Sequence, residues 1–322
     1  MQKVNRIILA PMEGVMDAQM RHIITQFGYI SHCVTEFVRV VDRLLPEHIF
    51  YKYCPELKQD TQVNNVPVRV QLLGQNPEYM ALNAERAIEL GSYGIDINFG
   101  CPAKKVNNSK GGAVLLKEPE TVYRIVKAVR EAVGSKDIVS VKMRLGYENT
   151  DLAFENAHAI EEAGASELAV HGRTKIQAYT GESDWTMIGQ IKQKLEIPVI
   201  ANGDINSFSA AQKCMSISGC WDIMIGRASL AIPNIAAVIN GKSQLKWSQI
   251  LNLLYLYGDG FELQDKSQYY HRRIKQWLRY LMTEYDEAVK LFEQIKTLQN
   301  KDEIKKLIYK KYKEYQHANT TY

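Results

Sequence analysis

Short apolar runs alternate with segments of helical periodicity eight times over about 230 residues of this 322-residue chain. The runs are nearly continuous in apolar character, which is typical of strands covered on both faces in a parallel sheet. Glycine, proline or polar residues bound each run. The eight predicted strands are Arg6–Met12, His32–Phe37, Val68–Leu73, Gly94–Gly100, Val139–Leu145, Glu167–Gly172, Pro198–Gly203 and Asp222–Arg227.

Predicted helices fill the intervals between these strands, and ordinary helix-start and helix-stop residues mark their ends. Eight strand–helix units predict an α/β fold, a closed (β/α)8 TIM barrel, over residues 1–242. A doubly wound parallel sheet is the alternative topology. Residues 243–322 are predicted to form a small C-terminal all-helical domain. The clearest barrel helices are Asn76–Gly91, Pro119–Gly134, Asp151–Gly164, Asp184–Leu195 and Ser207–Gly219.

The formal net charge of +4 is unevenly distributed along the chain. Residues 1–245 carry 26 Lys and Arg against 26 Asp and Glu, whereas residues 246–322 carry 14 against 10. The last quarter also holds ten of the eighteen tyrosines. Basic side chains interleaved with aromatic rings suit a nucleic-acid surface, where cations meet phosphates and rings stack on bases. A solvated helical face over a tyrosine-rich core accounts for the same composition equally well.

Cysteine usage and hydropathy indicate where the protein works. The five cysteines are odd in number and lack CxxC spacing, so no metal site is expected. The N-terminal segment lacks a signal-peptide core, and no stretch approaches the ~20 apolar residues of a membrane span. We therefore expect a reduced, cytoplasmic protein without a membrane partner. A monomer is a separate expectation.

Polar or small residues follow every predicted strand, at the carboxyl ends where barrel enzymes place their chemistry. Any one of them alone would more often be a rim residue with satisfied hydrogen bonds. Eight in succession at one mouth predict a binding site. They are Met12-Glu13, Glu36, Gln71, Asn98 with Cys101, Lys142 with Arg144, His171 with Arg173, Asn202 with Asp204, and Gly226-Arg227.

The types of these residues suit a flavin. Asn202-Gly203-Asp204 and Gly226-Arg227 follow the last two strands, where barrels commonly hold a phosphate on backbone N–H groups and a cation. Gln71 and Lys142 come from inner strands and can reach a flat heterocycle, and a cation near its pyrimidine end would stabilise the anionic reduced ring. No GxGxxG motif follows a strand, so FMN fits better than a Rossmann-bound dinucleotide.

Cys101 lies in the loop that follows the fourth predicted strand. Pro102 fixes the backbone just after the thiol, and Gly111 and Gly112 would let the loop move over a substrate. An isolated cysteine is more often a small buried hydrophobic residue. Its place at a strand end favours a functional thiol here, and the other four cysteines keep the structural interpretation.

At these residues the sequence resembles the tRNA-dihydrouridine synthases. The resemblance covers roughly residues 6–295, whereas the Lys- and Tyr-rich stretch after Asn300 matches no pattern of the family. Further segments, such as 35–42 and 273–278, resemble the bacterial C-type subgroup. The matching motifs run through the whole predicted barrel in order, namely APMEG from Ala10, VQL from Val70, DINFGCP from Asp96, VKMR from Val141, HGRT from His171, IANGD from Ile200 and MIGR from Met224.

The resemblance implies an enzyme that reduces the C5–C6 double bond of a uridine in tRNA, with FMN as cofactor and NADPH as the usual donor. Cys101 would be the general acid, which works as a protonated thiol, and Asn98 would meet the uracil. The subgroup implies uridine 16 of the D-loop. The residues that would hold the flavin are Pro11, Met12, Glu13, Gln71, Lys142, His171, Asn202, Gly203, Asp204, Gly226 and Arg227.

The subgroup resemblance also implies a set of RNA contacts. In the helix around residues 269–279, the spacing of Ile274, Trp277 and Leu278 suits a buried stripe and leaves several cations outward. A plain amphipathic helix is the alternative interpretation of those cations. The expected RNA contacts are Arg39, Tyr179, Arg272, Arg273, Lys275, Trp277 and Arg279.

Three other functions remain open at this stage. The same flavin barrel could act on a small free pyrimidine, although the basic, aromatic C-terminal region would then have no purpose. A lyase or aldolase could use Lys142 as a Schiff-base amine. A non-catalytic tRNA-binding protein would have no use for Cys101, Lys142 and His171 together.

Overall fold

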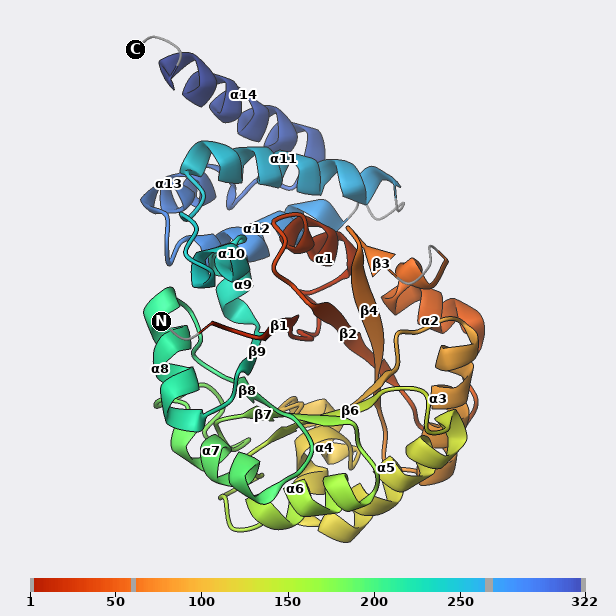
Figure 1. The fold of residues 1–322 in the computed structure, drawn as a ribbon. Coiled ribbons are helices and arrows are strands. Elements are labelled where there is room, and N and C mark those ends of the chain that lie inside the picture. The colour runs from red at the N-terminus through yellow and green to blue at the C-terminus, as the bar shows by residue number, and fades with distance from the viewer. Residues whose placement is uncertain (1–2, 59–61, 264–268, 320–322) are drawn as a thin grey trace.

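The computed structural model describes residues 3–58, 62–263 and 269–319 (Figure 1). Within these residues, eight parallel strands form a closed barrel, because β2 (His32–Arg39) and β4 (Val66–Leu73), at the two ends of the run of parallel strands, also pair with each other. The predicted TIM barrel is confirmed, and the doubly wound sheet is wrong. The barrel strands are β1 (Arg6–Leu9), β2 (His32–Arg39), β4 (Val66–Leu73), β5 (Ile95–Phe99), β6 (Val139–Arg144), β7 (Glu167–His171), β8 (Val199–Asn202) and β9 (Asp222–Ile225).

Helices surround the barrel. Four of them begin at a polar residue whose side chain caps the helix by accepting a backbone N–H, namely Asp17, Asn76, Asp184 and Ser207. The two-residue strand β3 (Gln62–Val63), which pairs antiparallel with β4, was not predicted. The surrounding helices are α1 (Ala18–Thr25), α2 (Glu47–Tyr53), α3 (Pro77–Glu89), α4 (Lys104–Asn108), α5 (Pro119–Val133), α6 (Ala153–Glu162), α7 (Trp185–Lys194) and α8 (Phe208–Ser218), with 3-10 turns η1 (Pro55–Lys58) and η2 (Gly112–Lys117).

Side chains alternate between the two faces of each strand, which separates the main core from the barrel interior. Outward residues such as Ile95, Ile97 and Phe99 pack against the helices in the main core. A small apolar cluster, which includes Ile8, Ile200 and Met224, belongs to the interior. This cluster fills the barrel below the carboxyl ends of the strands. The polar residues at those ends therefore line an open mouth and not a pore through the barrel.

A network of buried charges closes the opposite end of the barrel. Glu167 accepts hydrogen bonds from Arg69 at 2.6 Å and from Arg6 at 2.8 Å. Arg6 also pairs with Asp222 at 2.7 Å. Because each carboxylate has a cationic partner, these charges tolerate burial, and they hold distant strands together.

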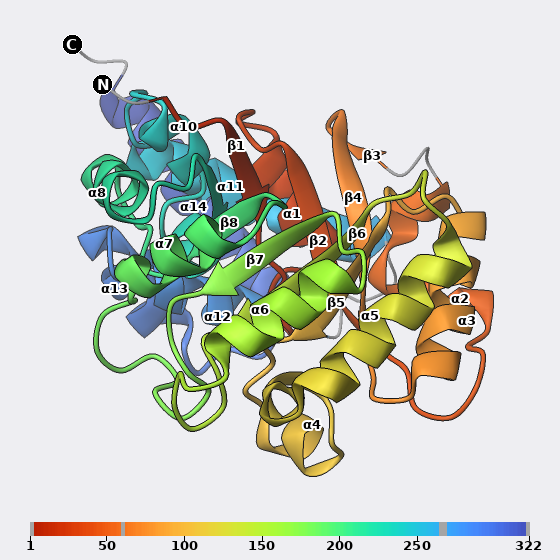
Figure 2. The ribbon, with the colours of Figure 1, turned by 60° about the horizontal axis from the view of Figure 1, so that its bottom comes forward.

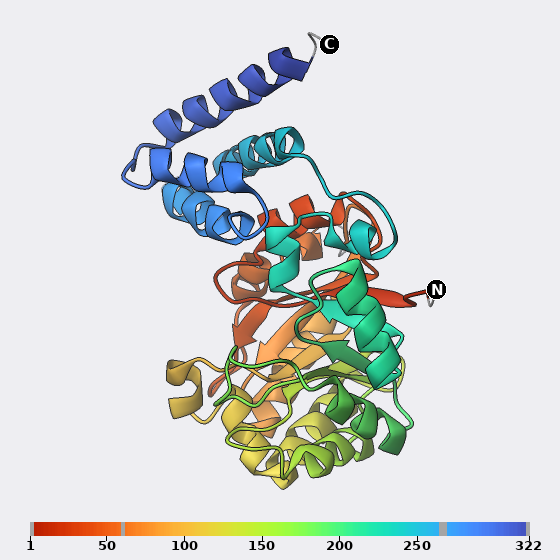
Figure 3. The same cartoon turned by 90° about the vertical axis from the view of Figure 1, so that its left-hand side faces the viewer.

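In the part of the chain that the structure describes, six helices follow the barrel. The last four gather on one flank of the molecule, where α11 contacts α1 (Figure 1). In Figure 3 they form a separate layer above the barrel, with α14 at the far edge. No helix among the residues that the structure describes is both long and apolar enough to cross a membrane. The six helices are α9 (Arg227–Ala231), α10 (Ile235–Ile239), α11 (Trp247–Leu263), α12 (Tyr270–Leu281), α13 (Asp286–Ile295) and α14 (Lys301–Asn319).

Candidate functional site at the barrel mouth

Strand register brings the predicted site residues together at the carboxyl end of the barrel. Asn98 on β5 is level with Lys142 on β6. Two residues further along, Arg144 on β6 is level with His171 on β7, which is level with Asn202 on β8. Residues far apart in sequence therefore become neighbours on four adjacent strands.

Lys142 is a half-buried residue that brings an ammonium group to this mouth. Its Nζ donates to Asn202 Oδ1 at 3.1 Å, and Asn202 Nδ2 donates in turn to the carbonyl of Met224 at 2.7 Å. Burial, followed by the charge of Arg144, lowers the pKa of Lys142 to about 8. An ammonium group can donate three hydrogen bonds, and among the described residues Lys142 makes one. It therefore keeps donor capacity for a ligand.

His171 is neutral in this environment. Burial, together with the positive charges of Lys142, Arg144, Arg173 and Arg227, lowers the pKa of its imidazole to about 2. A neutral imidazole offers one donor and one acceptor to a ligand. The same four cations give the mouth a positive field, which suits an anionic ligand.

Tyr179 lies above the mouth on the loop between β7 and α7, and the residue is 54% exposed. The guanidinium of Arg227 lies 4.2 Å from the ring centroid and that of Arg144 lies 5.7 Å away. Arg144 also donates to the carbonyls of Thr174 and Ala178 and thereby holds this loop in place. An exposed ring held between two cations is a surface on which a base can stack.

Hydrogen bonds and close packing hold the turn after β8. Asp204 accepts from Arg173 at 2.5 Å and from the backbone N–H of Ser183 at 2.9 Å. Gly203 has φ of +116°, and a Cβ there would stand 2.2 Å from Ser183 Oγ and 2.8 Å from His171 Cδ2. Only glycine fits this position, so the backbone can approach His171 and a ligand closely.

Pro11, Met12 and Glu13 follow β1 and border the same mouth. A Cβ on Gly226 would stand 3.4 Å from Met12 Sδ, so the ends of β1 and β9 meet. The backbone N–H of Gly14 donates to Glu36 on β2 at 2.5 Å. Burial, together with the nearby Asp17 and Glu13, raises the pKa of Glu36 to about 7.

Cys101 is buried in the loop after β5. Its backbone N–H and that of Gly100 both donate to Asn98 Oδ1, at 2.8 Å and 2.9 Å. Burial raises the pKa of the thiol, although the charges of Arg144 and Lys142 act in the opposite direction. A thiol with a raised pKa is protonated at neutral pH and can act as an acid.

The loop that carries Cys101 is folded and projects from the ring of helices as α4 (Figure 2). The side chain of Asn107 donates to the carbonyls of Cys101 and Ala103 and accepts from the N–H of Val114. These bonds tie both ends of the loop together. Whether the loop moves over a substrate stays a prediction.

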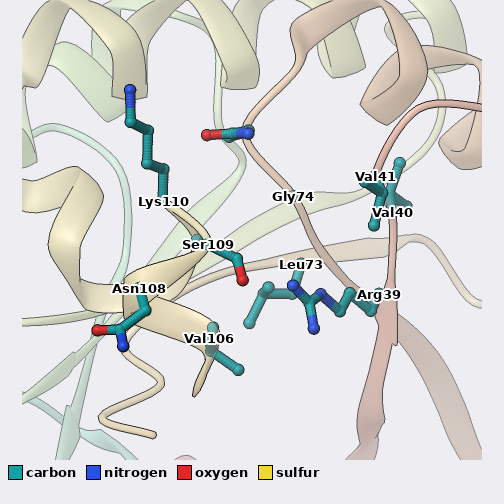
Figure 4. Close-up of a pocket in the computed structure, with 11 residues that line it drawn as sticks. Arg39, Val40, Val41, Leu73, Gly74, Val106, Asn108, Ser109 and Lys110 are labelled. Carbon is teal, nitrogen blue, oxygen red and sulfur yellow. The ribbon is translucent and has the colours of Figure 1, made fainter. Parts of the chain in front are cut away.

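A pocket of about 390 Å³ borders this loop. It lies between the ends of β2 and β4 and residues 106–111 (Figure 4). Arg39 extends from the end of β2 toward Leu73, whereas the side chain of Lys110 points away (Figure 4). The side chain of Arg39 makes no hydrogen bond or ion pair within the part of the chain that the structure describes. Its half-buried guanidinium is therefore available to an anion such as an RNA phosphate.

Gln71 is fully buried next to Asn98. Its side chain has no exposed surface, and its amide bonds to Asn98 and to Asp96. A direct contact between Gln71 and a flavin stays a prediction. The residue supports Asn98 from below.

Three expected RNA contacts on α12 have other roles. Trp277 is 1% exposed, and its indole N–H donates to the carbonyl of Leu230 at 3.0 Å. Its burial removes it from the RNA-contacting set. Arg273 pairs with Asp17 at 2.7 Å and donates to the carbonyls of Gly14 and Val15.

Lys275 is likewise engaged within the protein, because its ammonium group donates to the carbonyls of Lys296 and Leu298. Arg272 and Arg279 are exposed. The sequence pattern identified the buried stripe of α12 correctly, but it could not show which cations the barrel and α13 would use.

Two supporting residues were missed by sequence reasoning, namely Asp96 and Asn107. Asp96 stands two residues before Asn98 on the same strand, so strand alternation places both on the inward face. That spacing was a usable signal. No comparable signal marks Asn107, since its partners are backbone groups within a folded loop.

Comparisons with known proteins come from sequence and from structure. The family model described as dihydrouridine synthase matches residues 8–320. The tRNA-dihydrouridine(16) synthase of Escherichia coli is 50% identical over 306 residues, which cover 94% of this chain and 97% of that protein. The proteins of the same name from Haemophilus influenzae and Yersinia pestis are 50% and 48% identical, over 93% of this chain and 98% and 97% of their own lengths.

Two solved structures share the fold at low sequence identity. A 2-naphthoyl-CoA reductase complex has a TM-score of 0.57 at 13% identity, and the match covers 74% of this chain and 50% of that chain. A variant of NCR from Zymomonas mobilis has a TM-score of 0.54 at 14% identity, over 75% of this chain and 88% of that one. At this level of identity the likeness concerns the barrel fold alone.

Proposed function

The chain belongs to the dihydrouridine synthase family, and we propose that it reduces a uridine of tRNA to 5,6-dihydrouridine. The family expected from the motifs is thereby confirmed. Position 16 of the D-loop is the proposed target, because relatives named tRNA-dihydrouridine(16) synthase are about 50% identical over nearly the whole chain. The observation that carries the proposal is Cys101, a buried thiol held by Asn98 beside the cationic mouth.

A flavin is the cofactor that suits this mouth, and FMN is the form we propose. The donor set supports it, since Lys142 keeps unused donor capacity and four cations surround a neutral His171. A bound reduced flavin would supply the hydride for C6 of the uracil. The residues proposed to hold it are Pro11, Met12, Glu13, Gln71, Lys142, His171, Asn202, Gly203, Asp204, Gly226 and Arg227. NADPH as donor and a monomeric state remain predictions.

Cys101 supplies the proton in the proposed reaction. Hydride addition at C6 leaves negative charge at C5, conjugated into the C4 carbonyl, and a proton must then reach C5. A protonated thiol can deliver it. Asn98 keeps one N–H on Nδ2 beyond its bond to Gln71, and this group is proposed to meet the uracil.

The tRNA must present its base to a pocket far smaller than itself, so the target uridine is turned out of the folded RNA. Tyr179 is exposed above the mouth and Arg39 lines the adjoining pocket, and both are proposed to contact nucleotides near the target. Arg272 and Arg279 are the proposed phosphate contacts on α12. The proposed site of action is the cytoplasm.

The test of the function uses Cys101→Ala in the full-length enzyme. The variant should keep its flavin and still oxidise NADPH, yet form little dihydrouridine in tRNA. Cys220→Ala, which removes a buried thiol at the other end of the barrel, is the matched control and should retain activity. Undiminished product from Cys101→Ala would rule out its role as the acid.

A second measurement separates tRNA from a small substrate. Free uracil and tRNA are offered to the same enzyme, and turnover is followed by NADPH oxidation and by product analysis. We expect turnover with tRNA and none with free uracil. Comparable rates would favour the free-pyrimidine alternative, and borohydride trapping of a substrate on Lys142 would favour a Schiff-base enzyme.

A further inference from the structure

A chain of hydrogen bonds descends from the Cys101 loop to a buried carboxylate inside the barrel. The backbone N–H groups of Gly100 and Cys101 donate to Asn98 Oδ1. Asn98 Nδ2 donates to Gln71 Oε1 at 2.8 Å, and Gln71 Nε2 donates to Asp96 Oδ2 at 2.7 Å. Each link is shorter than 3 Å, and neither Asp96 nor Gln71 is more than 1% exposed.

We infer that Asp96 is a positioning residue for Cys101, because its carboxylate accepts the last hydrogen bond of this chain and so holds Gln71, Asn98 and the loop above them. Asp96 makes no hydrogen bond with Cys101 in the described part of the chain, so it acts on the thiol through Gln71 and Asn98. The inference deepens the proposed function, and only its kinetic test rests on that function.

The direction of the chain follows from the backbone. Two N–H groups can be accepted only by an oxygen, so the carbonyl of the Asn98 amide must face the loop and its NH2 must face Gln71. Gln71 must then present its own oxygen upward and its NH2 downward. An amide NH2 in this buried position requires an acceptor, and Asp96 provides one.

Strand register explains why Asp96 can terminate the chain. Gln71 on β4 and Ser140 on β6 are both level with Asp96 on β5. Ser140 Oγ donates to Asp96 Oδ1 at 2.5 Å, so each carboxylate oxygen accepts one hydrogen bond. Burial raises the pKa of Asp96 to about 6, against the hydrogen bonds from Gln71 and Ser140. At neutral pH the group therefore accepts from both neighbours.

Loss of the Asp96 carboxylate should disrupt this chain of hydrogen bonds. Without it, the NH2 of Gln71 is left unsatisfied in the interior, or the amide turns and presents NH2 to the NH2 of Asn98. Either outcome disturbs the group that holds the N–H of Cys101. A small displacement of a reacting group is costly, up to about 100-fold in rate for roughly 1 Å.

The kinetic test compares Asp96→Val with Asp96→Asn in the full-length, flavin-loaded enzyme. Asparagine keeps an oxygen for Gln71 and can turn its NH2 toward Ser140, whose hydroxyl can accept. We expect Asp96→Val to lose about 10- to 100-fold in kcat with tRNA, at an unchanged KM. Asp96→Asn should stay within about fivefold of the wild type, the equivalent of one neutral hydrogen bond.

Ser140→Ala is the matched control, because it removes the other partner of Asp96 and leaves the chain to Cys101 intact. It should also stay within about fivefold of the wild type. A merely structural role of Asp96 would affect stability and flavin content without this split between Asp96→Val and Asp96→Asn.

A second measurement requires no tRNA activity. The rate of Cys101 alkylation by iodoacetamide is followed by peptide mass spectrometry, with the four other buried cysteines as internal standards. We expect Cys101 in Asp96→Val to react several-fold faster than in the wild type and in Asp96→Asn. If the wild type makes no dihydrouridine, the proposed function fails. The alkylation rates of Cys101 still test the chain of hydrogen bonds from Asp96 to the Cys101 loop.

The inference is overturned by any of three results. One is a kcat and a Cys101 alkylation rate for Asp96→Val that equal those of the wild type. Another is equal impairment of Asp96→Asn and Asp96→Val. The third is failure of both Asp96→Val and Asp96→Ala to fold, which would assign Asp96 a role in folding instead.

Discussion

Lys142 shows how burial at a strand end prepares one side chain for chemistry. The ordinary pKa of a lysine is about 10.4. Here burial and the neighbouring Arg144 lower the pKa to about 8, while Asp96 below it acts in the opposite direction. The group is still charged at neutral pH, and a charged donor is what an anionic reduced flavin requires.

This environment predicts a pH dependence. A lowered pKa means that Lys142 loses its proton as the pH rises through about 8. If the ammonium form supports flavin reduction, the rate of that step with NADPH should fall above this pH, as measured by stopped-flow bleaching of the flavin. Lys142→Arg stays charged and should show no such fall. An unchanged alkaline limb in Lys142→Arg would assign the titration to another group.

At the residue scale the sequence predicted most of the candidate site. Cys101, Asn98, Lys142 and His171 were identified because they follow predicted strands in motifs that resemble a family. Asp96 was missed because its supporting role depends on a hydrogen bond from Gln71. Gln71 lies 25 positions away and becomes a neighbour of Asp96 only through strand register.

Helix α12 is the element for which prediction and structure differ most. Its apolar spacing predicted a buried stripe, and Ile274, Trp277 and Leu278 are indeed buried. Its cations divide into two groups. Arg272 and Arg279 are exposed, whereas Arg273 turns toward the loop between β1 and α1, where it meets Asp17.

Two adjacent arginines therefore give opposite predictions. Arg272→Ala should weaken tRNA binding and reduce the slope of log affinity against log salt by about 1, as for the loss of one phosphate contact. Arg273→Ala should leave that slope unchanged and lower the free energy of unfolding by about 1.5–3 kcal/mol, because a charged group loses its hydrogen bonds. Filter binding across a salt series and urea unfolding measure the two effects.

Arg279→Ala provides a control on the same helix and should behave as Arg272→Ala does. A reduced salt slope for Arg273→Ala with unchanged stability would contradict the structure and return Arg273 to the RNA face. Arg272→Ala and Arg273→Ala remove the same charge, so a difference between them reports the position of each arginine on the helix.

At the scale of the whole molecule, Trp277 joins the C-terminal helices to the barrel. Its indole packs edge-on against Tyr257 with ring centroids 5.1 Å apart, and its N–H reaches Leu230 on α9. Helix α9 begins at Arg227, a residue of the candidate site. The junction therefore supports the mouth as well as the helical layer.

Loss of this junction should affect both the helical layer and the barrel mouth. Trp277→Ala should lower the free energy of unfolding by about 3–5 kcal/mol, the range for a large buried aromatic side chain. It should also reduce flavin retention on dialysis, because α9 loses its support. Trp277→Phe keeps most of the packing and should lose only about 1 kcal/mol with the hydrogen bond. Full flavin retention in a destabilised Trp277→Ala would show that the mouth is independent of the junction.

The sequence by itself determined the barrel, the order of its strands and the motifs at their ends, because periodicity and helix capping depend on near neighbours. Strand limits agreed within a few residues, as for Val139–Leu145 against Val139–Arg144. Only the tertiary structure decided that Arg273 serves the β1–α1 loop, that Trp277 is buried, and that Asp96 supports Cys101 through Gln71 and Asn98. These partners come from distant parts of the chain, and barrel closure and helix docking set the distances between them.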